Sequence, residues 1–325
     1  MLTYDFRLPP GPRTVEYAVL AEKLGFRAVW CPEIPAFGHD IWVTLARIAE
    51  KTTRLKFGPA VLIPSYHHPM AQASAIATVE QLAPGRLMVG FGTGFTGRTG
   101  MGQKPLTLAS MRTHITQVRS LLRGDVTDID GGLAQILASP GWLPDRPIDV
   151  PLYMAGQGPR SRALAKDICD GLISLRVPAE GFANCLVSAS GTVLDDGEDV
   201  TSPRAATALK PLIALAYHHR FTTDPESVKE LPNGEAWLAS VERADESVRH
   251  LSVHRGHNLD ISNGHDALVE VSASARQATF TGTREELRER LAQLEAGGAT
   301  GVIFGTSGYD VERELRAYAE VAGLR

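Results

Sequence analysis

Cysteine is scarce in this chain of 325 residues. The three that occur, Cys31, Cys169 and Cys185, stand far apart, and no two of them form a CxxC pair. We therefore expect neither a disulfide framework nor a structural zinc site built on cysteines. The cytoplasm is the expected compartment.

The chain also lacks a long hydrophobic run and an excess of positive charge. No apolar stretch approaches the roughly 18 residues that a membrane-spanning helix needs. Residues 1–8 form a short mixed segment before Pro9 and Pro10, unlike the basic and then apolar start of a secretory signal. The formal net charge is -4 at pH 7, whereas nucleic acids and anionic membranes favour a basic face. Neither kind of partner is expected.

Short apolar runs alternate with helical patterns over the first 175 residues, which is typical of βαβ units with a parallel sheet. Eight runs are predicted as strands, and most precede a helical pattern: 3–8, 28–31, 55–62, 87–91, 150–155, 171–175, 209–216 and 301–304. The length suits one barrel with additions. We predict an α/β protein with a (β/α)8 TIM barrel and insertions after the later strands.

Several helix boundaries carry capping signals. Asp40 is expected to cap a helix that runs to about residue 51, and a helix is expected over 69–82. Thr283 and Glu286 form a capping-box pattern, and a last helix is expected over 311–322.

The periodic pattern fails in two places, about 176–206 and 217–281, which we interpret as irregular insertions into a single domain spanning 1–325. Glycine, serine and acidic residues dominate 188–202, which predicts an exposed loop. A helix is expected near 235–249. Insertions after barrel strands commonly form active-site lids.

Two glycine-containing turns follow predicted strands. Residues 90–98 contain Gly92, Gly94 and Gly97, and glycine lets backbone amides approach an anion or a flat ring. Residues 154–160 lead directly into a helix, whose free amides and dipole suit a phosphate. Both turns are also consistent with plain turns. A side chain at Gly158 is expected to strain the second turn.

A third stretch, residues 58–69, is too apolar and proline-rich for a plain strand exit. In this order and spacing, the three stretches resemble the luciferase-like oxidoreductases. That family includes bacterial luciferase, FMN monooxygenases and deazaflavin F420-dependent reductases and dehydrogenases. Residues 21–30, 84–90 and 282–287 carry the resemblance too, whereas residues 176–281 match weakly.

The resemblance implies F420 or FMN as cofactor and a small organic substrate. In F420-using members a non-proline cis peptide backs the ring, and Ala60 and Val61 occupy the matching place. Cofactor ribityl and phosphate groups are expected on six residues of the two turns: Thr93, Gly94, Gly156, Gln157, Gly158 and Pro159. In the FMN case a separate flavin reductase is an expected partner, as an F420 reductase can be in the F420 case.

Glu33 stands where the family often places an acidic residue before a catalytic histidine, but this chain has Ile34 at the next position. His39 and His67 are the candidates to replace that histidine, because imidazole shuttles protons near neutral pH. Replacing Glu33 by glutamine is expected to lower activity with thermal stability nearly unchanged.

The other histidines are His68, His114, His218, His219, His250, His254, His257 and His265. Among them, His254 and His257 have the spacing of a metal-binding pair. No third ligand is evident from the sequence, so no metal is expected.

Two other function classes stay open: a non-catalytic flavin-binding relative and a phosphate-binding barrel isomerase or aldolase. An aldolase would want a lysine at a strand end, and none of the seven lysines stands convincingly there. We also expect a homodimer, since helices after the second and third strands are rich in small apolar residues: Ala71, Ala73, Ala75 and Ala77.

Overall fold

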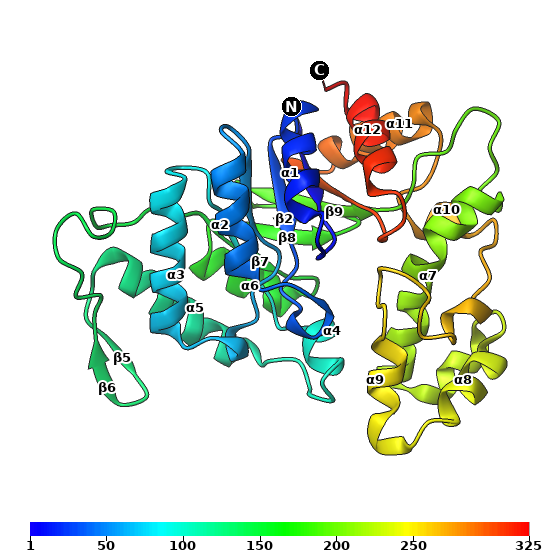
Figure 1. Ribbon diagram of the computed structural model, residues 1–325, viewed down its shortest axis with the longest axis horizontal. Helices are drawn as coiled ribbons and strands as arrows, with labels where there is room; N and C mark the ends of the chain where they lie inside the picture. The colour runs from blue at the N-terminus through cyan, green and yellow to red at the C-terminus, as the bar shows by residue number, and fades with distance from the viewer. Residues whose placement is uncertain (325) are drawn as a thin grey trace.

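Eight parallel strands form the centre of the computed structural model, which describes residues 1–324 (Figure 1). They are β1 (Thr3–Arg7), β2 (Ala28–Cys31), β3 (Lys56–Pro59), β4 (Val89–Phe91), β7 (Leu152–Ala155), β8 (Gly171–Leu175), β9 (Cys185–Ser190) and β10 (Gly301–Gly305). Their order is β3-β2-β1-β10-β9-β8-β7-β4. Parallel bridges from Phe57 to Leu87 and from Leu62 to Phe91 join the two end strands. The predicted TIM-barrel fold is confirmed.

Helices surround the strands: α1 (Thr14–Lys23), α2 (Ile41–Lys51), α3 (Pro69–Leu82), α5 (Leu108–Arg123), α6 (Pro159–Ile168), α11 (Arg284–Ala296) and α12 (Val311–Ala322). The capping signals are confirmed. The Asp40 carboxylate accepts a hydrogen bond from the amide of Val43 at 2.9 Å, and Thr283 with Glu286 forms a complete capping box. These side chains satisfy first-turn amides that no helix carbonyl can reach.

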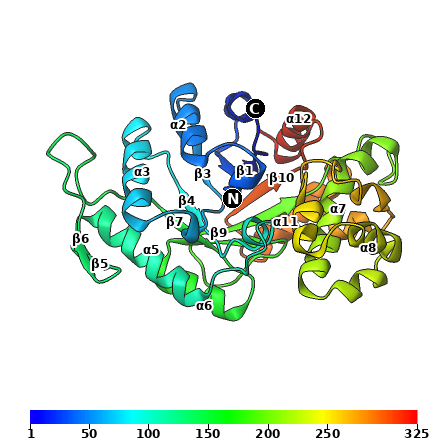
Figure 2. The same cartoon turned by 60° about the horizontal axis from the view of Figure 1, so that its bottom comes forward.

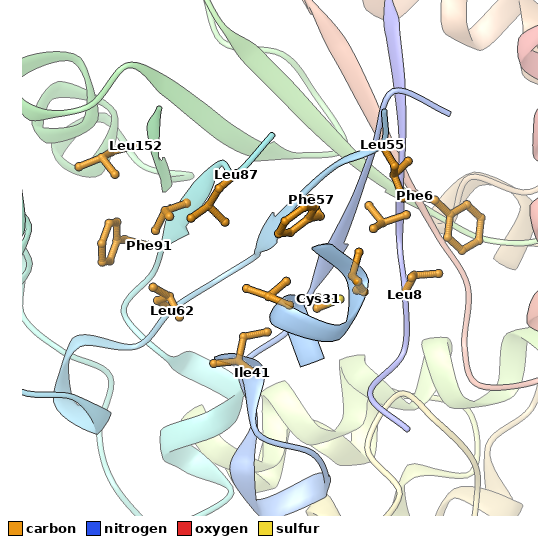
Figure 3. Packing of buried hydrophobic residues seen from close by; sticks show 14 of the residues in the cluster. Phe6, Leu8, Cys31, Ile41, Leu55, Phe57, Leu62, Leu87, Phe91 and Leu152 are labelled. Carbon is orange, nitrogen blue, oxygen red and sulfur yellow. The ribbon is translucent and has the colours of Figure 1, made fainter. Parts of the chain in front are cut away.

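Two apolar layers follow from the alternation of side chains along each strand. The outer layer lies between strands and helices and includes Phe6, Phe57 and Phe91 (Figure 3). The inner layer fills the barrel with six large side chains: Trp30, Met88, Tyr153, Ile173, Leu186 and Ile303. The barrel interior is thus a packed core rather than a pore.

The predicted seventh strand is wrong. Residues 209–216 lie in a helix, α7 (Pro203–Thr223), and the strand is β9, half of which falls in the predicted loop 188–202. A short apolar run does not distinguish a buried helix from a buried strand. In β9 the polar residues Ser188 and Ser190 lie among buried neighbours. Both edges of the strand are paired, and this pairing holds the strand in place although it contains serines.

Residues 203–278 form a helical insertion beside the barrel (Figures 1 and 2). It contains α7, η3 (Pro225–Glu230), α8 (Gly234–Glu242), η4 (Glu246–Val248), α9 (Arg249–His254), η5 (Asp266–Leu268) and α10 (Ala275–Ala278). The helix expected over 235–249 ends at Glu242. A separate apolar cluster that includes Tyr217, Trp237 and Val253 holds the insertion together.

The helical insertion contacts loops that follow barrel strands. The Ser307 hydroxyl donates to the carbonyl of Ala208 at 2.8 Å, and the Gly308 amide donates to the carbonyl of Leu259 at 3.1 Å. Because both loop residues follow β10, the insertion lies against the carboxyl end of the barrel.

Smaller elements complete the chain: 3-10 helices η1 (Pro35–Phe37) and η2 (Pro64–Tyr66), helix α4 (Phe95–Thr99), and the hairpin β5 (Thr127–Ile129) and β6 (Gly132–Ala134). The hairpin extends away from the barrel in Figure 1. Within residues 1–324, no helix combines the length and apolar character needed to cross a membrane.

Candidate functional site

The mouth of the barrel, at the carboxyl ends of the strands, is lined by small residues. Side chains alternate between the inside and the outside of the barrel along each strand. The residues that point inward at this end are Ala60, Gly92, Ala155, Ser190 and Gly305. The layer directly below contains Trp30 and Tyr153, whose rings contact edge to face at 5.7 Å. A flat ring placed at the mouth would therefore rest on a filled floor.

A Cβ atom at Gly92 would lie 2.4 Å from Cγ2 of Val61. This contact places Val61 directly against the inward face of β4. The peptide bond between Ala60 and Val61 is cis, which is the geometry that the resemblance implied. Ala60 and Val61 therefore lie at the mouth as expected.

Arg7 is the cation at the mouth, and sequence reasoning missed it. Its guanidinium donates to the Ser190 hydroxyl at 3.1 Å, and no carboxylate within residues 1–324 lies within 4.0 Å of it. Burial lowers the pKa of Arg7, but a guanidinium stays charged in proteins. A half-buried cation at this position, with no carboxylate partner among the described residues, can bind an anionic or carbonyl oxygen of a ligand.

The layer below shows how an inward charge is neutralised. Asp5, two residues earlier on β1, is fully buried. It accepts from the indole of Trp30 at 2.8 Å and pairs with the Arg27 guanidinium. Arg7 has no such partner, although the spacing of Asp5 and Arg7 on a predicted strand could have indicated two inward charges.

The buried Glu33 and the half-buried His67 form a pair beside the mouth. Glu33 follows β2 and is 3% exposed, and His67 follows η2. One oxygen of Glu33 contacts Nε2 of His67 at 2.5 Å, and the other accepts from the amide of Ile63 at 2.7 Å. The hydrogen bond to Glu33 raises the pKa of His67. A histidine held by a carboxylate can take up and release a proton near neutral pH.

His39 lies in the loop before α2 and is exposed. No hydrogen bond links it to Glu33 or His67 among the described residues. The structure therefore brings together two of the three proposed catalytic residues.

Gly94 has a structural reason to be glycine. It precedes α4 with a φ of 75°, and a Cβ atom there would lie 2.7 Å from a methyl of Ile63. The carbonyl of the neighbouring Thr93 accepts from the amide of Leu106 at 2.9 Å. Packing against Ile63 thus explains the glycine at position 94. Thr93, which follows β4, is half-buried.

The turn of residues 156–159 leads from β7 into α6. Gly156 is buried and its amide donates to the carbonyl of Ile173 at 3.1 Å, whereas Gln157, Gly158 and Pro159 are exposed. Gly158 caps α6 without a side-chain bond, at φ -89° and ψ 164°.

A Cβ atom at Gly158 would meet nothing within 4 Å. The expectation that a side chain there strains the turn is therefore wrong, because the backbone is extended and the space is open. First-turn amides such as those of Arg160 and Ser161 have no helix carbonyl to bond. They can bind a phosphate, and the positive end of the helix dipole would strengthen that contact.

Three further histidines lie together in the helical insertion. The side chain of His218 on α7 is buried against His254 and His257, and it supplies the third nitrogen that the sequence did not reveal. His218 and the exposed His219 lie on a helix rather than after a strand as predicted. The His219 ring lies 5.1 Å from the ring of Phe95.

A surface hollow of about 460 Å³ lies outside the barrel, lined in part by Arg162, Lys166, Pro178 and Phe182. None of the predicted site residues lines it. We place the candidate site at the mouth because the carboxyl ends of the strands, the Arg7 guanidinium and several small residues lie together there.

Known proteins with similar sequences and folds identify the family of this chain. The sequence model of the family described as luciferase-like monooxygenase matches residues 7–301. The chain is 26% identical over 332 residues to the F420-dependent glucose-6-phosphate dehydrogenase of Amycolatopsis mediterranei, covering 95% of this chain and 93% of that protein. It is 29% identical over 168 residues to the 5,10-methylenetetrahydromethanopterin reductase of Methanolobus tindarius, covering 50% of each. The chain thus spans about half the length of this reductase.

Solved structures share the fold. An F420-dependent secondary alcohol dehydrogenase, in complex with an F420-acetone adduct, matches with a TM-score of 0.70 at 17% identity over 98% of both chains. The oxygenating constituent of 3,6-diketocamphane monooxygenase from Pseudomonas putida, in complex with FMN, matches with a TM-score of 0.59 at 13% identity. That match covers 99% of this chain and 96% of the monooxygenase. The chain belongs to the luciferase-like monooxygenase family, and the relatives named above include two F420-dependent dehydrogenases and a monooxygenase in complex with FMN.

Proposed function

We propose that the protein binds coenzyme F420 at the mouth of the barrel and catalyses hydride transfer to or from a small organic substrate. The observation that carries this proposal is the ring of small residues, Ala60, Gly92, Ala155, Ser190 and Gly305, above a filled aromatic floor. These five residues and the floor below them, which we call the ring seat, fit a flat tricyclic ring. The relative from Amycolatopsis mediterranei, which the match covers almost throughout, is F420-dependent.

Each group at the mouth has a proposed role. When bound, the deazaflavin supplies the hydride chemistry. Ala60 and Val61 lie against one face of the ring seat, and the turn of residues 156–159 holds the cofactor phosphate. The Glu33 and His67 pair holds or releases a proton at Nε2 of His67, and Arg7 orients an oxygen of the substrate.

Side-by-side titration tests the cofactor. Purified protein is titrated with F420 and with FMN while the fluorescence of each is followed. We expect saturable quenching of F420 at micromolar concentrations or below, with much weaker binding of FMN. The reverse order would favour a monooxygenase that receives reduced FMN from a separate reductase, and binding of neither would contradict both proposals.

Gly158→Val is expected to weaken F420 affinity by more than tenfold. A valine at the start of α6 projects into open space, where it would obstruct a phosphate approaching the first-turn amides. A tenfold loss needs only about 1.4 kcal/mol, and charge-assisted backbone contacts are worth roughly 1.5–3 kcal/mol each. Affinity is measured by fluorescence titration and folding by circular dichroism. Gly132→Val is the control, because Gly132 is another surface glycine. Gly197 is unsuitable because its φ is 74°.

The fold of Gly158→Val is expected to remain intact, since the backbone conformation suits valine. Normal F420 affinity in the folded variant would remove the turn of residues 156–159 from the cofactor site.

A homodimer remains the expected assembly, on altered grounds. Of the four alanines on α3, Ala73 and Ala77 face the protein's own core and are fully buried, so they cannot contribute to a dimer, whereas Ala71 is exposed and Ala75 is half-buried. Large apolar side chains are instead exposed on and after the β5–β6 hairpin, with Leu133, Leu137 and Trp142 at 81%, 85% and 75%. We expect a dimer in sedimentation at micromolar concentration, shifted towards monomer by Leu137→Ser with Trp142→Ser. A wild-type monomer would contradict this.

A further inference from the structure

The helical insertion contains a cluster of three buried imidazoles that the mouth does not use. His218 lies on α7, His254 is the last residue of α9, and His257 follows in the next turn. Their exposures are 1%, 3% and 9%. One nitrogen from each lies within 4.8 Å of the other two, although His218 is more than 30 positions away in the sequence.

The Nδ1 atom of His257 lies close to the Nδ1 atoms of the other two rings. Nδ1 of His257 lies 2.8 Å from Nδ1 of His218 and 3.0 Å from Nδ1 of His254. On the far side of the His218 ring, Nε2 lies 3.0 Å from both oxygens of Asp266. A neutral imidazole carries one N–H. If Nε2 of His218 donates to Asp266, its Nδ1 presents a lone pair to the cluster.

Hydrogen bonding satisfies this arrangement poorly. If His257 carries its proton on Nδ1, that single N–H cannot point straight at both neighbouring nitrogens, and one of the two short contacts is left without a well-aligned proton. A cation between the three rings would accept the lone pairs of all three imidazoles.

The surroundings also suit a metal ligand. Asp266 is itself fixed by the Trp237 indole at 3.1 Å and by the Asn263 amide at 2.8 Å. A carboxylate that orients a histidine ligand from behind is the usual second partner of such a histidine.

We propose that His218, His254 and His257 bind one divalent transition-metal ion through their Nδ1 atoms, with Zn²⁺ as the ion that best fits three imidazoles. A tetrahedral ion with Zn–N bonds of about 2.0–2.1 Å separates its nitrogen ligands by roughly 3.3 Å. The two observed separations need to open by a few tenths of an ångström. Water completes the fourth position.

The ion would connect α7 to the turn after α9 and brace the helical insertion against the mouth. The His257 ring lies 5.8 Å from the ring of Phe37, in the loop after β2. A Cβ atom on Gly100, beyond β4, would lie 3.7 Å from Cβ of His254. The proposed metal site therefore belongs to the helical insertion and not to the ring seat. Its role there would be structural.

The test uses full-length protein purified without a polyhistidine tag and treated with EDTA. Zn²⁺ is titrated in competition with a chromophoric chelator, and Tm is measured with and without Zn²⁺. We expect one Zn²⁺ per chain and a higher Tm with Zn²⁺, because an ion that binds only the folded state stabilises it. His254→Gln and His257→Gln are expected to lose at least 100-fold in Zn²⁺ affinity.

His250→Gln is the matched control, since His250 lies on α9 but outside the cluster, and it should bind Zn²⁺ normally. Binding of Co²⁺ to the wild-type protein gives a spectroscopic readout that needs no variant to fold. No stoichiometric Zn²⁺ or Co²⁺ binding by folded wild-type protein, or equal binding by both cluster variants, would overturn the proposal. The cofactor is absent from this experiment, so its outcome is independent of the function proposed above.

Discussion

Replacing Ala155 by phenylalanine is expected to lower cofactor affinity about 100-fold while the barrel stays folded. Ala155 ends β7 on its inward side, next above Tyr153. A phenylalanine there would occupy the space that the ring of small residues leaves at the mouth. A 100-fold loss corresponds to about 2.7 kcal/mol, within the usual cost of forcing extra volume into a packed site.

Fluorescence titration with F420 measures this loss, and circular dichroism monitors folding. Ala163→Phe is the control, because Ala163 lies on the exposed side of α6 and should bind F420 normally. If folded Ala155→Phe binds F420 as the wild type does, the ring seat is not at the mouth.

Glu33→Gln is expected to reduce turnover by at least tenfold and also to lower stability, by about 1–3 kcal/mol. The expectation of nearly unchanged stability does not fit the structure, because Glu33 is buried and bonded to both Ile63 and His67. Glutamine keeps an acceptor for the Ile63 amide but loses the charged bond to His67. Hydrogen bonds to charged groups contribute roughly 1.5–3 kcal/mol.

This loss of stability should depend on pH. Glu33 raises the pKa of His67 above its ordinary value of 6.5, so the folded state binds the His67 proton more tightly than the unfolded state does. The stabilisation is fully present below pH 6.5 and is lost as pH rises through the raised pKa. Urea unfolding should therefore show a large difference between wild type and Glu33→Gln at pH 6 and a smaller one at pH 9.

His39→Gln is the control for the pH experiment, because His39 is exposed and its replacement should have a small effect at both pH values. An equal stability difference for Glu33→Gln at pH 6 and pH 9 would mean that the pair is a neutral hydrogen bond. In that case His67 would not be the proton carrier proposed here.

Much of the fold could be predicted from the sequence because its signals are local. The bounds of α3, α12 and β8 match the expected ranges, since periodicity and caps act within a few residues. The seventh strand could not be predicted in the same way. Residues 185–190 are a strand because β8 and β10 pair with both edges, and the partners on β10 lie more than 100 positions away in the sequence.

The sequence by itself determined the barrel, the family resemblance and the turns at 92–94 and 156–159. Only the tertiary structure decided which side chains meet. Arg7 reaches Ser190 across 183 positions, His67 reaches Glu33, and His218 joins His254 and His257. The physical reason is that closing the barrel and docking the helical insertion, rather than any local pattern, place these charges and imidazoles within bonding distance.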